Sequence, residues 1–300
     1  MIELQLKLLG DNLRNKAFYD ALKKVIVKGK TVVADIGSGT GFLSFLASAL
    51  GAKECHLYEY DEELLQLSRE IAAANNIKNC KFFAAHSSEI KNPPKADIVI
   101  SETLGNYALE ENIIENMCDA KRFLKPGGIV IPQKIEQFVA PVTSPRLIGK
   151  INTWKDVGFG LDLSALAPAA LNNMFVYKIL PADLLQQKNA IQKWDDIDLQ
   201  KNEKSVRTGR AQWKIEKDCE IFGFAIWWNC ELIPKITLST SPFEKQTHWD
   251  QIFLPLSKSL NFKKGGVLNL SIKSDSRRDV GIRLNWEANG IKMDSSKGIN

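Results

Sequence analysis

The sequence of 300 residues predicts a doubly wound parallel α/β domain followed by an all-β domain. Up to about residue 132, short apolar runs alternate with segments in which apolar residues recur at helical spacing. This alternation is typical of a parallel sheet with right-handed crossovers. After Pro132, apolar and polar residues alternate one by one, as they do in antiparallel strands. We therefore expect two domains, over 1–132 and 133–300.

The first half is expected to contain four helices and five strands. The first helix is indicated by Leu13, Ala17 and Ala21, which recur on one side. The second ends before Gly51, because glycine takes the left-handed conformation after a helix end. The helices are expected at 11–24, 42–50, 62–75 and 110–124, and the strands at 31–37, 54–61, 80–86, 96–102 and 127–132.

The second half is expected to form a barrel or a sandwich of antiparallel strands. Turn residues separate the alternating segments, which lie at 135–142, 211–215, 220–232, 234–242, 266–274 and 280–288. Residues 144–173 break this rhythm and predict a helical and loop-like insertion.

The composition is that of an ordinary folded protein, with 44% hydrophobic and 25% charged residues. No apolar run approaches the roughly 20 residues that span a bilayer, and the N-terminus lacks the apolar core of a signal peptide, so no membrane association is expected. The net charge of +5 comes from scattered Lys and Arg and does not indicate dedicated nucleic-acid binding. Five spaced cysteines without a CxxC pair, and three histidines, predict neither a disulfide framework nor a metal site. They favour a cytoplasmic location.

A glycine-rich turn follows the first predicted strand. The string ADIGSGTGF places Gly37, Gly39 and Gly41 where the chain must turn sharply and approach a ligand closely. Asp35 would repel a pyrophosphate but suits a cationic ammonium group, and Glu59 can accept bonds from both hydroxyls of a ribose. These features favour S-adenosylmethionine over a nicotinamide dinucleotide. The alternative is a glycine turn that binds no ligand, with Asp35 and Glu59 as solvated carboxylates.

Two carboxylates follow the fourth predicted strand. Glu102 lies at the strand tip, where open α/β sheets bind ligands, and Glu111 comes nine residues later in the predicted first turn of the next helix. Two facing anions favour a delocalised cation such as a guanidinium, which offers a planar fork of N–H donors. Taken alone, they could equally be a strand-end carboxylate and an acid that stabilises a helix N-terminus.

With these motifs the chain resembles the protein arginine methyltransferases. The string SETLGNYALEE is similar to their double-glutamate loop, and DIGSGTG to their cofactor turn. Thr247, His248 and Trp249 resemble their Thr-His-Trp loop, while GGIVIP and WKDVGFGLDLS resemble their domain junction and dimerisation arm. The resemblance implies a Rossmann-like methyltransferase domain followed by a β-barrel domain, with the arm at about 144–173.

The resemblance also assigns the binding residues of the implied cofactor, S-adenosyl-L-methionine. Arg14 aligns with the arginine that pairs with the cofactor carboxylate. Ser88 and Glu89 lie where the family contacts the adenine ring. Asp35, the three glycines and Glu59 hold the rest of the cofactor.

The implied catalytic residues are Glu102, Glu111, His248 and Asp11. The two glutamates would clamp the guanidinium of a protein arginine, the expected methyl acceptor. Asp11 aligns with the acid that pairs with the histidine of the Thr-His-Trp loop, so we expect an ion pair with His248. The alternative is a His248 ring that packs on Trp249 and touches no acid.

Two further expectations concern the backbone and the assembly. A cis peptide bond is expected at Ile131–Pro132. A homodimer is expected, in which the arm reaches the Rossmann-like domain of a partner, because Trp154, Phe159 and Leu161 are too apolar for a free loop.

Departures from the family pattern leave the identity of the methyl acceptor undecided. The aromatic helix that precedes the equivalent of Arg14 in the family is missing, so we expect a lid that is short or absent. Thr103 and Asn106 replace a usual Trp and Tyr. Another nitrogen nucleophile, such as a metabolite or nucleotide, is therefore an alternative acceptor, and a cofactor-binding protein without turnover is a further alternative. Leu8 and Ile113 leave the number of transferred methyl groups open.

Overall fold

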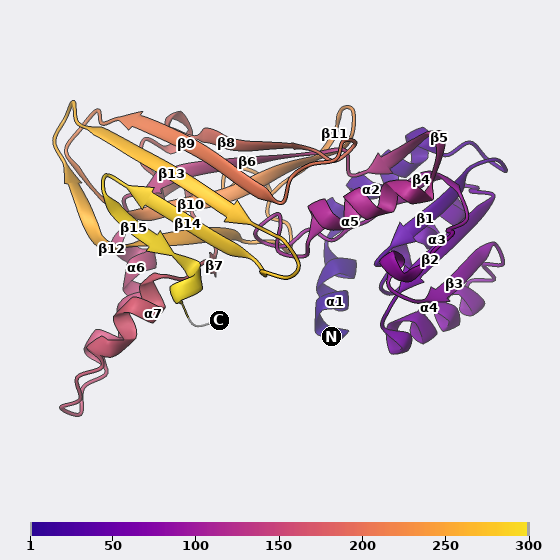
Figure 1. Ribbon diagram of the computed structural model, residues 1–300, viewed down its shortest axis with the longest axis horizontal. Coiled ribbons are helices and arrows are strands. Elements are labelled where there is room, and N and C mark those ends of the chain that lie inside the picture. Colours follow the sequence, from indigo (N-terminus) through magenta and orange to yellow (C-terminus); the bar gives the residue numbers. More distant parts are fainter. Residues whose placement is uncertain (1, 299–300) are drawn as a thin grey trace.

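The computed structural model describes residues 2–298 and shows two parts joined end to end (Figure 1). A five-stranded parallel sheet lies at one end, and two antiparallel sheets lie at the other. No helix in this described range is both long and apolar enough to cross a bilayer.

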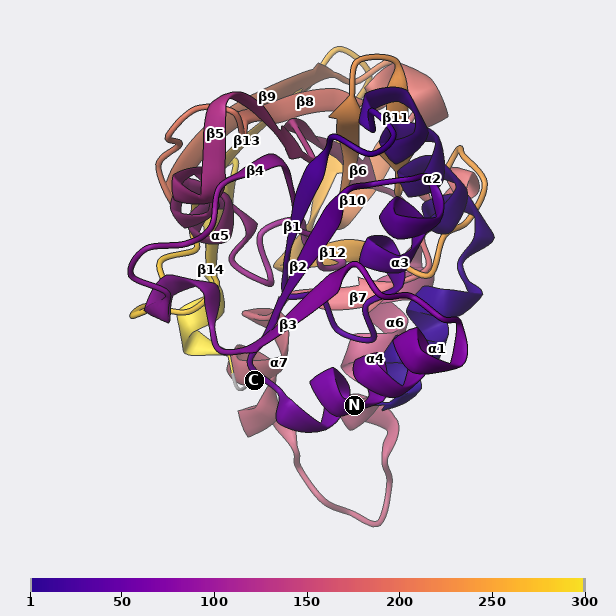
Figure 2. The same ribbon diagram turned by 90° about the vertical axis from the view of Figure 1, so that its right-hand side faces the viewer.

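The N-terminal part confirms the doubly wound α/β prediction. Its sheet has the order β3-β2-β1-β4-β5, with every pair parallel. Helix α5 lies on one side of the sheet, and α2, α3 and α4 lie on the other (Figure 2). The strand order reverses between β1 and β4, and such a switch point is where open α/β sheets bind ligands. The elements are β1 Val32–Ile36, β2 Glu54–Glu59, β3 Cys80–Ala84, β4 Ala96–Ile100, β5 Leu124–Ile131, α2 Asn12–Val25, α3 Phe42–Ala49, α4 Glu62–Ala74 and α5 Ile113–Ala120.

The C-terminal part is a β-barrel built from two antiparallel sheets. One sheet has the order β7-β12-β10-β6-β8 with β11 paired to β10, and the other has the order β15-β14-β13-β9. Contacts between β8 and β9, and between β12 and β15, join the two sheets. Large buried rings fill the core of this part, among them Phe224, Trp213 and Trp286. The strands are β6 Lys134–Val142, β7 Phe175–Tyr177, β8 Gln192–Asp198, β9 Val206–Lys214, β10 Cys219–Ile233, β11 Ile236–Ser239, β12 Gln251–Phe262, β13 Val267–Asp275, β14 Arg283–Ala288 and β15 Ile291–Asp294.

The cis peptide bond that was predicted lies between the two parts, and a partly helical segment follows the first barrel strand. Strand β5 ends at Ile131, the Ile131–Pro132 bond is cis, and β6 begins at Lys134. Residues 144–173 hold two short helices, α6 Pro145–Ile151 and α7 Ala167–Leu171, and single turns of 3₁₀ helix. This arm extends away from the barrel in Figure 1.

The expected start of the helix after the fourth strand is wrong. Helix α5 begins at Ile113, so Glu111 does not lie in its first turn. Glu111 instead belongs to a tight turn in which the Glu110 amide donates to the Tyr107 carbonyl at 2.9 Å and the Asn112 amide to the Leu109 carbonyl at 3.1 Å. Asn112 ends this turn with a φ of 57°, a left-handed conformation that asparagine tolerates better than most residues.

A helix that we did not expect precedes α2. Helix α1 spans Ile2–Gly10, where we expected a short or absent lid. None of its side chains is buried in the core, but Leu4, Gln5 and Leu8 line the cavity described below. The chain therefore has a helix beside this cavity, built from leucines rather than aromatic residues.

Candidate functional site

The carboxyl ends of β1, β2 and β4 open into a cavity of about 530 Å³. Its walls come from α1, α2, the glycine turn, the loop after β4 and the loop before β12. The cavity therefore lies at the switch point of the parallel sheet and is completed by the barrel.

The glycine turn closes against the end of β2. The amides of Gly37 and Ser38 donate to the Tyr58 carbonyl at 2.9 and 3.1 Å. Gly37, Gly39 and Gly41 have φ angles of 70°, 53° and 81°, which favour glycine. A Cβ atom at Gly41 would also lie 2.3 Å from the Ser68 hydroxyl. Gly37 and Gly39 line the cavity, while Gly41 supports the turn from behind.

Glu59 is held at the end of β2 by backbone donors. Its two carboxylate oxygens accept from the Gly39 amide at 2.8 Å and from the Asp61 amide at 2.9 Å. The side chain lines the cavity although the residue is almost fully buried. The carboxylate thus has a fixed position beside the glycine turn.

Asp35 is a buried acid in the floor of the cavity. Burial raises its pKa to about 7, and the nearby charge of Glu59 adds to this, against the hydrogen bond from the Ser44 hydroxyl at 2.8 Å. A carboxyl group in this situation ionises more readily when a cation binds next to it. The site therefore favours a ligand with a positive group at Asp35.

Arg14 of α2 pairs with Glu102 inside the protein. Its Nε donates to Glu102 Oε2 at 2.8 Å, and its Nη2 donates to the same oxygen. Both side chains are about 95% buried, with exposures of 6% and 5%. The sequence placed Arg14 at the cofactor carboxylate, and the structure shows that this guanidinium also holds a glutamate of the predicted clamp.

Glu102, Glu110 and Glu111 all line the same cavity. The cavity walls withdraw Glu111 from bulk water, and this burial, together with the charges of Glu102 and Glu110, raises its pKa to about 7. Burial also raises the pKa of Glu110. The carboxylates are thus close enough to repel one another, and a bound cation would relieve that repulsion.

The barrel holds the loop that carries these glutamates. The indole N–H groups of Trp249 and Trp228 donate to the carbonyls of Leu104 and Gly105 at 2.7 and 3.0 Å. The side-chain oxygen of Asn106 accepts from the Asp250 amide at 2.9 Å. The cavity is therefore assembled by the packing of one domain on the other.

The predicted contact between Asp11 and His248 is present. His248 Nδ1 lies 2.8 Å from Asp11 Oδ2, which also accepts from the His248 amide at 2.8 Å. The other oxygen of Asp11 accepts from the Arg14 amide at 2.9 Å and caps α2. The His248 ring also packs on Trp249, with centroids 3.9 Å apart. Asp11 therefore joins the barrel to the helix that carries Arg14.

Two predicted cofactor residues do not line the cavity. Ser88 and Glu89 lie in a turn of 3₁₀ helix over Ser87–Glu89, outside the cavity walls. Sequence reasoning also missed Tyr60 and Asp61, which follow β2 and do line it. Their position directly after Glu59, at the carboxyl end of a parallel strand, was the signal that could have found them.

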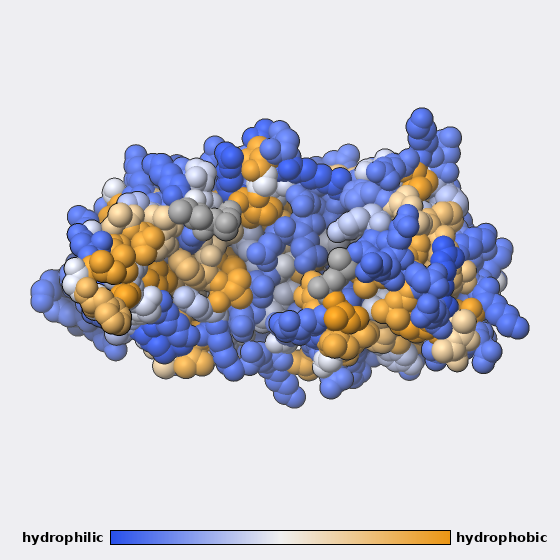
Figure 3. All heavy atoms as spheres, turned by 90° about the horizontal axis from the view of Figure 1, so that it is seen from below, coloured by the Kyte–Doolittle hydropathy of each residue, from blue (hydrophilic) through white to orange (hydrophobic). Residues whose placement is uncertain are grey.

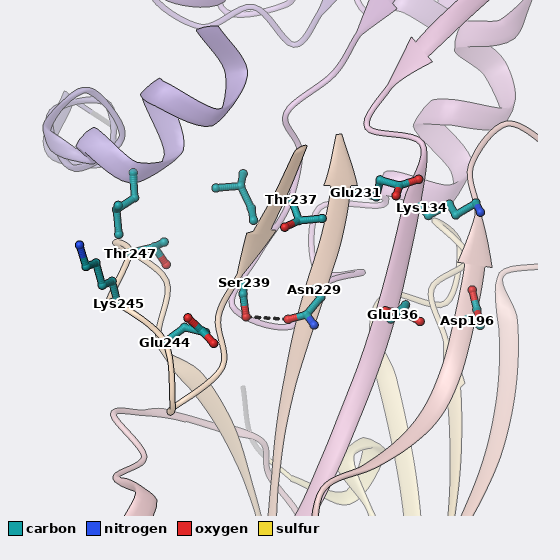
Figure 4. A pocket seen from close by; sticks show the side chains of 12 residues that line it. Lys134, Glu136, Asp196, Asn229, Glu231, Thr237, Ser239, Glu244, Lys245 and Thr247 are labelled. Atoms are coloured by element: carbon teal, nitrogen blue, oxygen red, sulfur yellow. Dashed lines mark hydrogen bonds between the residues drawn. The ribbon is translucent and has the colours of Figure 1, made fainter. Parts of the chain in front are cut away.

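A second cavity of about 720 Å³ lies across the barrel sheet beside α2. Figure 4 shows acidic side chains on neighbouring strands, with Glu136 on β6, Asp196 on β8 and Glu231 on β10. Lys193 pairs with the first two of these, at 2.9 and 2.7 Å. Lys134 and Lys245 line the same cavity, so its surface carries charges of both signs. Glu244 and Thr247 lie on the loop that leads to His248, so the second cavity adjoins the first.

Comparisons with known proteins agree with this architecture. A model of the arginine methyltransferase oligomerization subdomain matches residues 133–291, and a methyltransferase-domain model matches residues 27–191. Protein arginine N-methyltransferase 1 of Dictyostelium discoideum is 28% identical over 98% of this chain and 89% of its own. Protein arginine N-methyltransferase 6 of Xenopus tropicalis is 26% identical over 95% of this chain and 88% of its own.

Solved structures show the same fold. The Trypanosoma brucei PRMT1 enzyme-prozyme heterotetrameric complex with AdoHcy has a TM-score of 0.85 at 21% identity, over 97% of this chain and 96% of that one. The Arabidopsis thaliana protein arginine methyltransferase 10 has a TM-score of 0.79 at 20% identity, over 98% of both chains. Because the oligomerization-subdomain match alone spans more than half of the sequence, this chain belongs to the protein arginine methyltransferases, a family of S-adenosylmethionine-dependent enzymes.

Proposed function

We propose that this chain methylates arginine in proteins and that Glu102 and Glu111 clamp the acceptor guanidinium. The observation that carries the proposal is the placement of both glutamates in one cavity with the glycine turn and Glu59. The clamp would bring the acceptor within reach of the cofactor, and such positioning supplies a large share of the rate in transfer reactions.

The residues around the turn fit S-adenosylmethionine. Glycines at 37 and 39 leave room for a close approach, and Glu59 offers a carboxylate to ribose hydroxyls. The buried carboxyl group of Asp35 suits the cofactor ammonium group, because a cation next to it would stabilise its ionised form. Arg14 would hold the cofactor carboxylate. The cofactor supplies a methyl group on a cationic sulfur, which is the electrophile of the reaction.

The glutamates would make the acceptor more nucleophilic. A free guanidinium is a poor nucleophile because its lone pairs are delocalised. Carboxylates at two of its nitrogens draw the positive charge toward them and leave more electron density on the third. The reaction releases one proton from the acceptor, and the Glu111 carboxylate at the clamp can accept it.

A basic protein segment is the acceptor that the surroundings favour. Glu231 and Glu244 line the second cavity, which adjoins the active cavity, and they can pair with cationic residues next to the target arginine, whereas Glu136 and Asp196 already pair with Lys193. Another nitrogen nucleophile is the second candidate. Thr103 and Asn106 favour it, since they replace the aromatic walls and leave space beside the clamp.

Labelled cofactor tests the function directly. The protein is incubated with methyl-labelled S-adenosylmethionine and an arginine-rich protein, and the acid hydrolysate is separated by amino-acid analysis. We expect label in methylarginines, and roughly a hundredfold slower labelling with Glu102→Gln. Label that appears only in small molecules would support the second candidate, and label in neither would contradict both.

We also propose that the chain forms a homodimer through its arm. The arm exposes Val157, Phe159, Leu161 and Leu166 to solvent. Figure 3 shows apolar surface over the arm and again beside α1, where Ile2, Leu4 and Leu6 are exposed. Apolar groups at two distant sites of one chain suit contact with a second copy. The division into domains over 1–132 and 133–300 and the cytoplasmic location stay predictions.

A further inference from the structure

A buried tyrosine anchors the glutamate-bearing loop inside the barrel. Tyr107 lies between Glu102 and Glu111 in sequence, and its side chain is fully buried. Its hydroxyl donates to the Ser274 hydroxyl oxygen of β13 at 2.7 Å. Ser274 is also fully buried, so water cannot replace this bond without entering the core.

The bond lies next to a network of buried polar groups. The amide nitrogen of Gln137 donates to Asp195 at 3.0 Å, and Arg207 pairs with the same carboxylate at 2.7 Å. Burial raises the pKa of the Tyr107 hydroxyl well above its ordinary value. The negative charge of Asp195 also raises this pKa, whereas the side chain of Gln137 lowers it. The hydroxyl therefore stays protonated and remains a donor to Ser274.

Tyr107 lies between the part of the loop that carries Glu102 and the part that carries Glu111, and different contacts hold these two parts. The part near Glu102 is fixed through the carbonyls of Leu104 and Gly105 and through Arg14. The part with Glu111 is a turn that starts at the Tyr107 carbonyl, to which the Glu110 amide donates. A shift of Tyr107 would therefore move Glu111 while Glu102 stays in place.

We propose that Tyr107 is a positioning residue that sets the place of Glu111 relative to Glu102 through its bond to Ser274. This inference rests on the proposed function for the role of the two glutamates. The acceptor clamp is then set from inside the barrel, by a contact that touches neither the cofactor nor the acceptor.

Kinetics of Tyr107→Phe test the proposal. The change removes only the hydroxyl, and we expect kcat with an arginine peptide to fall about tenfold, which corresponds to about 1.4 kcal/mol. The Kd of S-adenosylmethionine should change less than about twofold, because Asp35 and Glu59 keep their contacts. Ser274→Ala should match Tyr107→Phe, the double variant should be no worse than either one, and Ser274→Thr should retain activity.

Ser276→Ala is the matched control. Ser276 is equally buried and lies two residues further along, but it donates to Glu115 of α5 at 2.8 Å instead of contacting the loop. We expect this variant to keep kcat. Equal losses in the Ser276 and Ser274 variants would show a general weakening of the interface and would overturn the proposal.

Titration of Glu111 gives a readout that needs no turnover. In carbon NMR of labelled protein, the Glu111 carboxyl should titrate near pH 7 in the wild type and at a different pH in Tyr107→Phe, because its pKa depends on its distance from Glu102 and Glu110. Unchanged titration in the variant overturns the proposal. A wild type without arginine methylation contradicts the proposed function, and the titration still decides the role of Tyr107. If Tyr107→Phe does not fold, Ser274→Ala is titrated in its place.

Discussion

At the scale of single residues, substitutions of Glu59 and Glu102, which line the same cavity, are expected to change different quantities. Glu59→Ala should raise the Kd of S-adenosylmethionine, because ribose contacts are equal in the ground and transition states. Glu102→Gln should mainly lower kcat, by roughly a hundredfold for a lost contact of about 3 kcal/mol. Calorimetric titration of the cofactor and steady-state kinetics of both variants check this. Equal changes in cofactor affinity would show that the two roles are misassigned.

The raised pKa of Glu111 predicts a pH dependence of the acceptor reaction. The clamp needs an ionised carboxylate, and Glu111 loses its proton only as the pH passes about 7. At saturating cofactor, kcat/KM for an arginine peptide should therefore rise with pH through about 7 and level off above it. Asp35 titrates in the same range, so the Kd of the cofactor is measured at each pH as a separate curve. Glu111→Gln, assayed for its residual activity, should lack the rise. A wild-type profile that is flat from pH 6 to 8 would contradict the clamp.

At the scale of elements, α2 depends on Asp11 for both its cap and its contact with the barrel. Burial opposes ionisation of Asp11, but the bonds from His248 and the Arg14 amide lower its pKa to about 2. A carboxyl group whose pKa is lowered on folding stabilises the protein above its unfolded pKa of about 3.8, and this stability is lost as the pH falls toward 2. The difference corresponds to about 2 kcal/mol.

Chemical denaturation at several pH values tests this role of Asp11. Asp11→Asn should lower the free energy of unfolding by about 2 kcal/mol at pH 7 and should flatten its fall between pH 4 and pH 2. Asp20→Asn is a suitable control, since Asp20 lies on the same helix in an exposed pair with Lys16. Identical pH curves for Asp11→Asn and the wild type would refute the prediction.

At the scale of the whole molecule, the arm is expected to determine the oligomeric state. The Phe159 side chain is 94% exposed in the single chain, so Phe159→Ser should cost little in folding but should weaken a dimer interface. Light scattering at micromolar concentration should show a dimer for the wild type and a monomer for the variant. Val267→Ser replaces an exposed apolar residue of β13, in the four-stranded sheet of the barrel, and this variant should stay dimeric. A monomeric wild type would contradict the predicted homodimer.

Local sequence patterns predicted most of the elements but not all of them. The alternation in 266–274 and 280–288 is present because β13 and β14 bury one face only. Strand β12 escaped detection because the side chains of 251–256 are all buried, so the apolar run has no period of two. Strand β8 was not predicted, because acidic residues interrupt its apolar alternation, although Asp195 is buried against Gln137 and Arg207.

The sequence alone predicted the chain order of strands and helices, the glycine turn, the two glutamates after the fourth strand and the pairing of Asp11 with His248. These follow from residue type and short-range spacing, or from a resemblance that rests on such motifs. Three contacts of the site were not predicted: Arg14 holds Glu102, Glu111 lies in a turn before α5, and Tyr107 donates to Ser274. Such contacts join residues far apart in sequence, and they depend on how the barrel packs against the parallel sheet. A periodicity read along one segment carries no information about that packing.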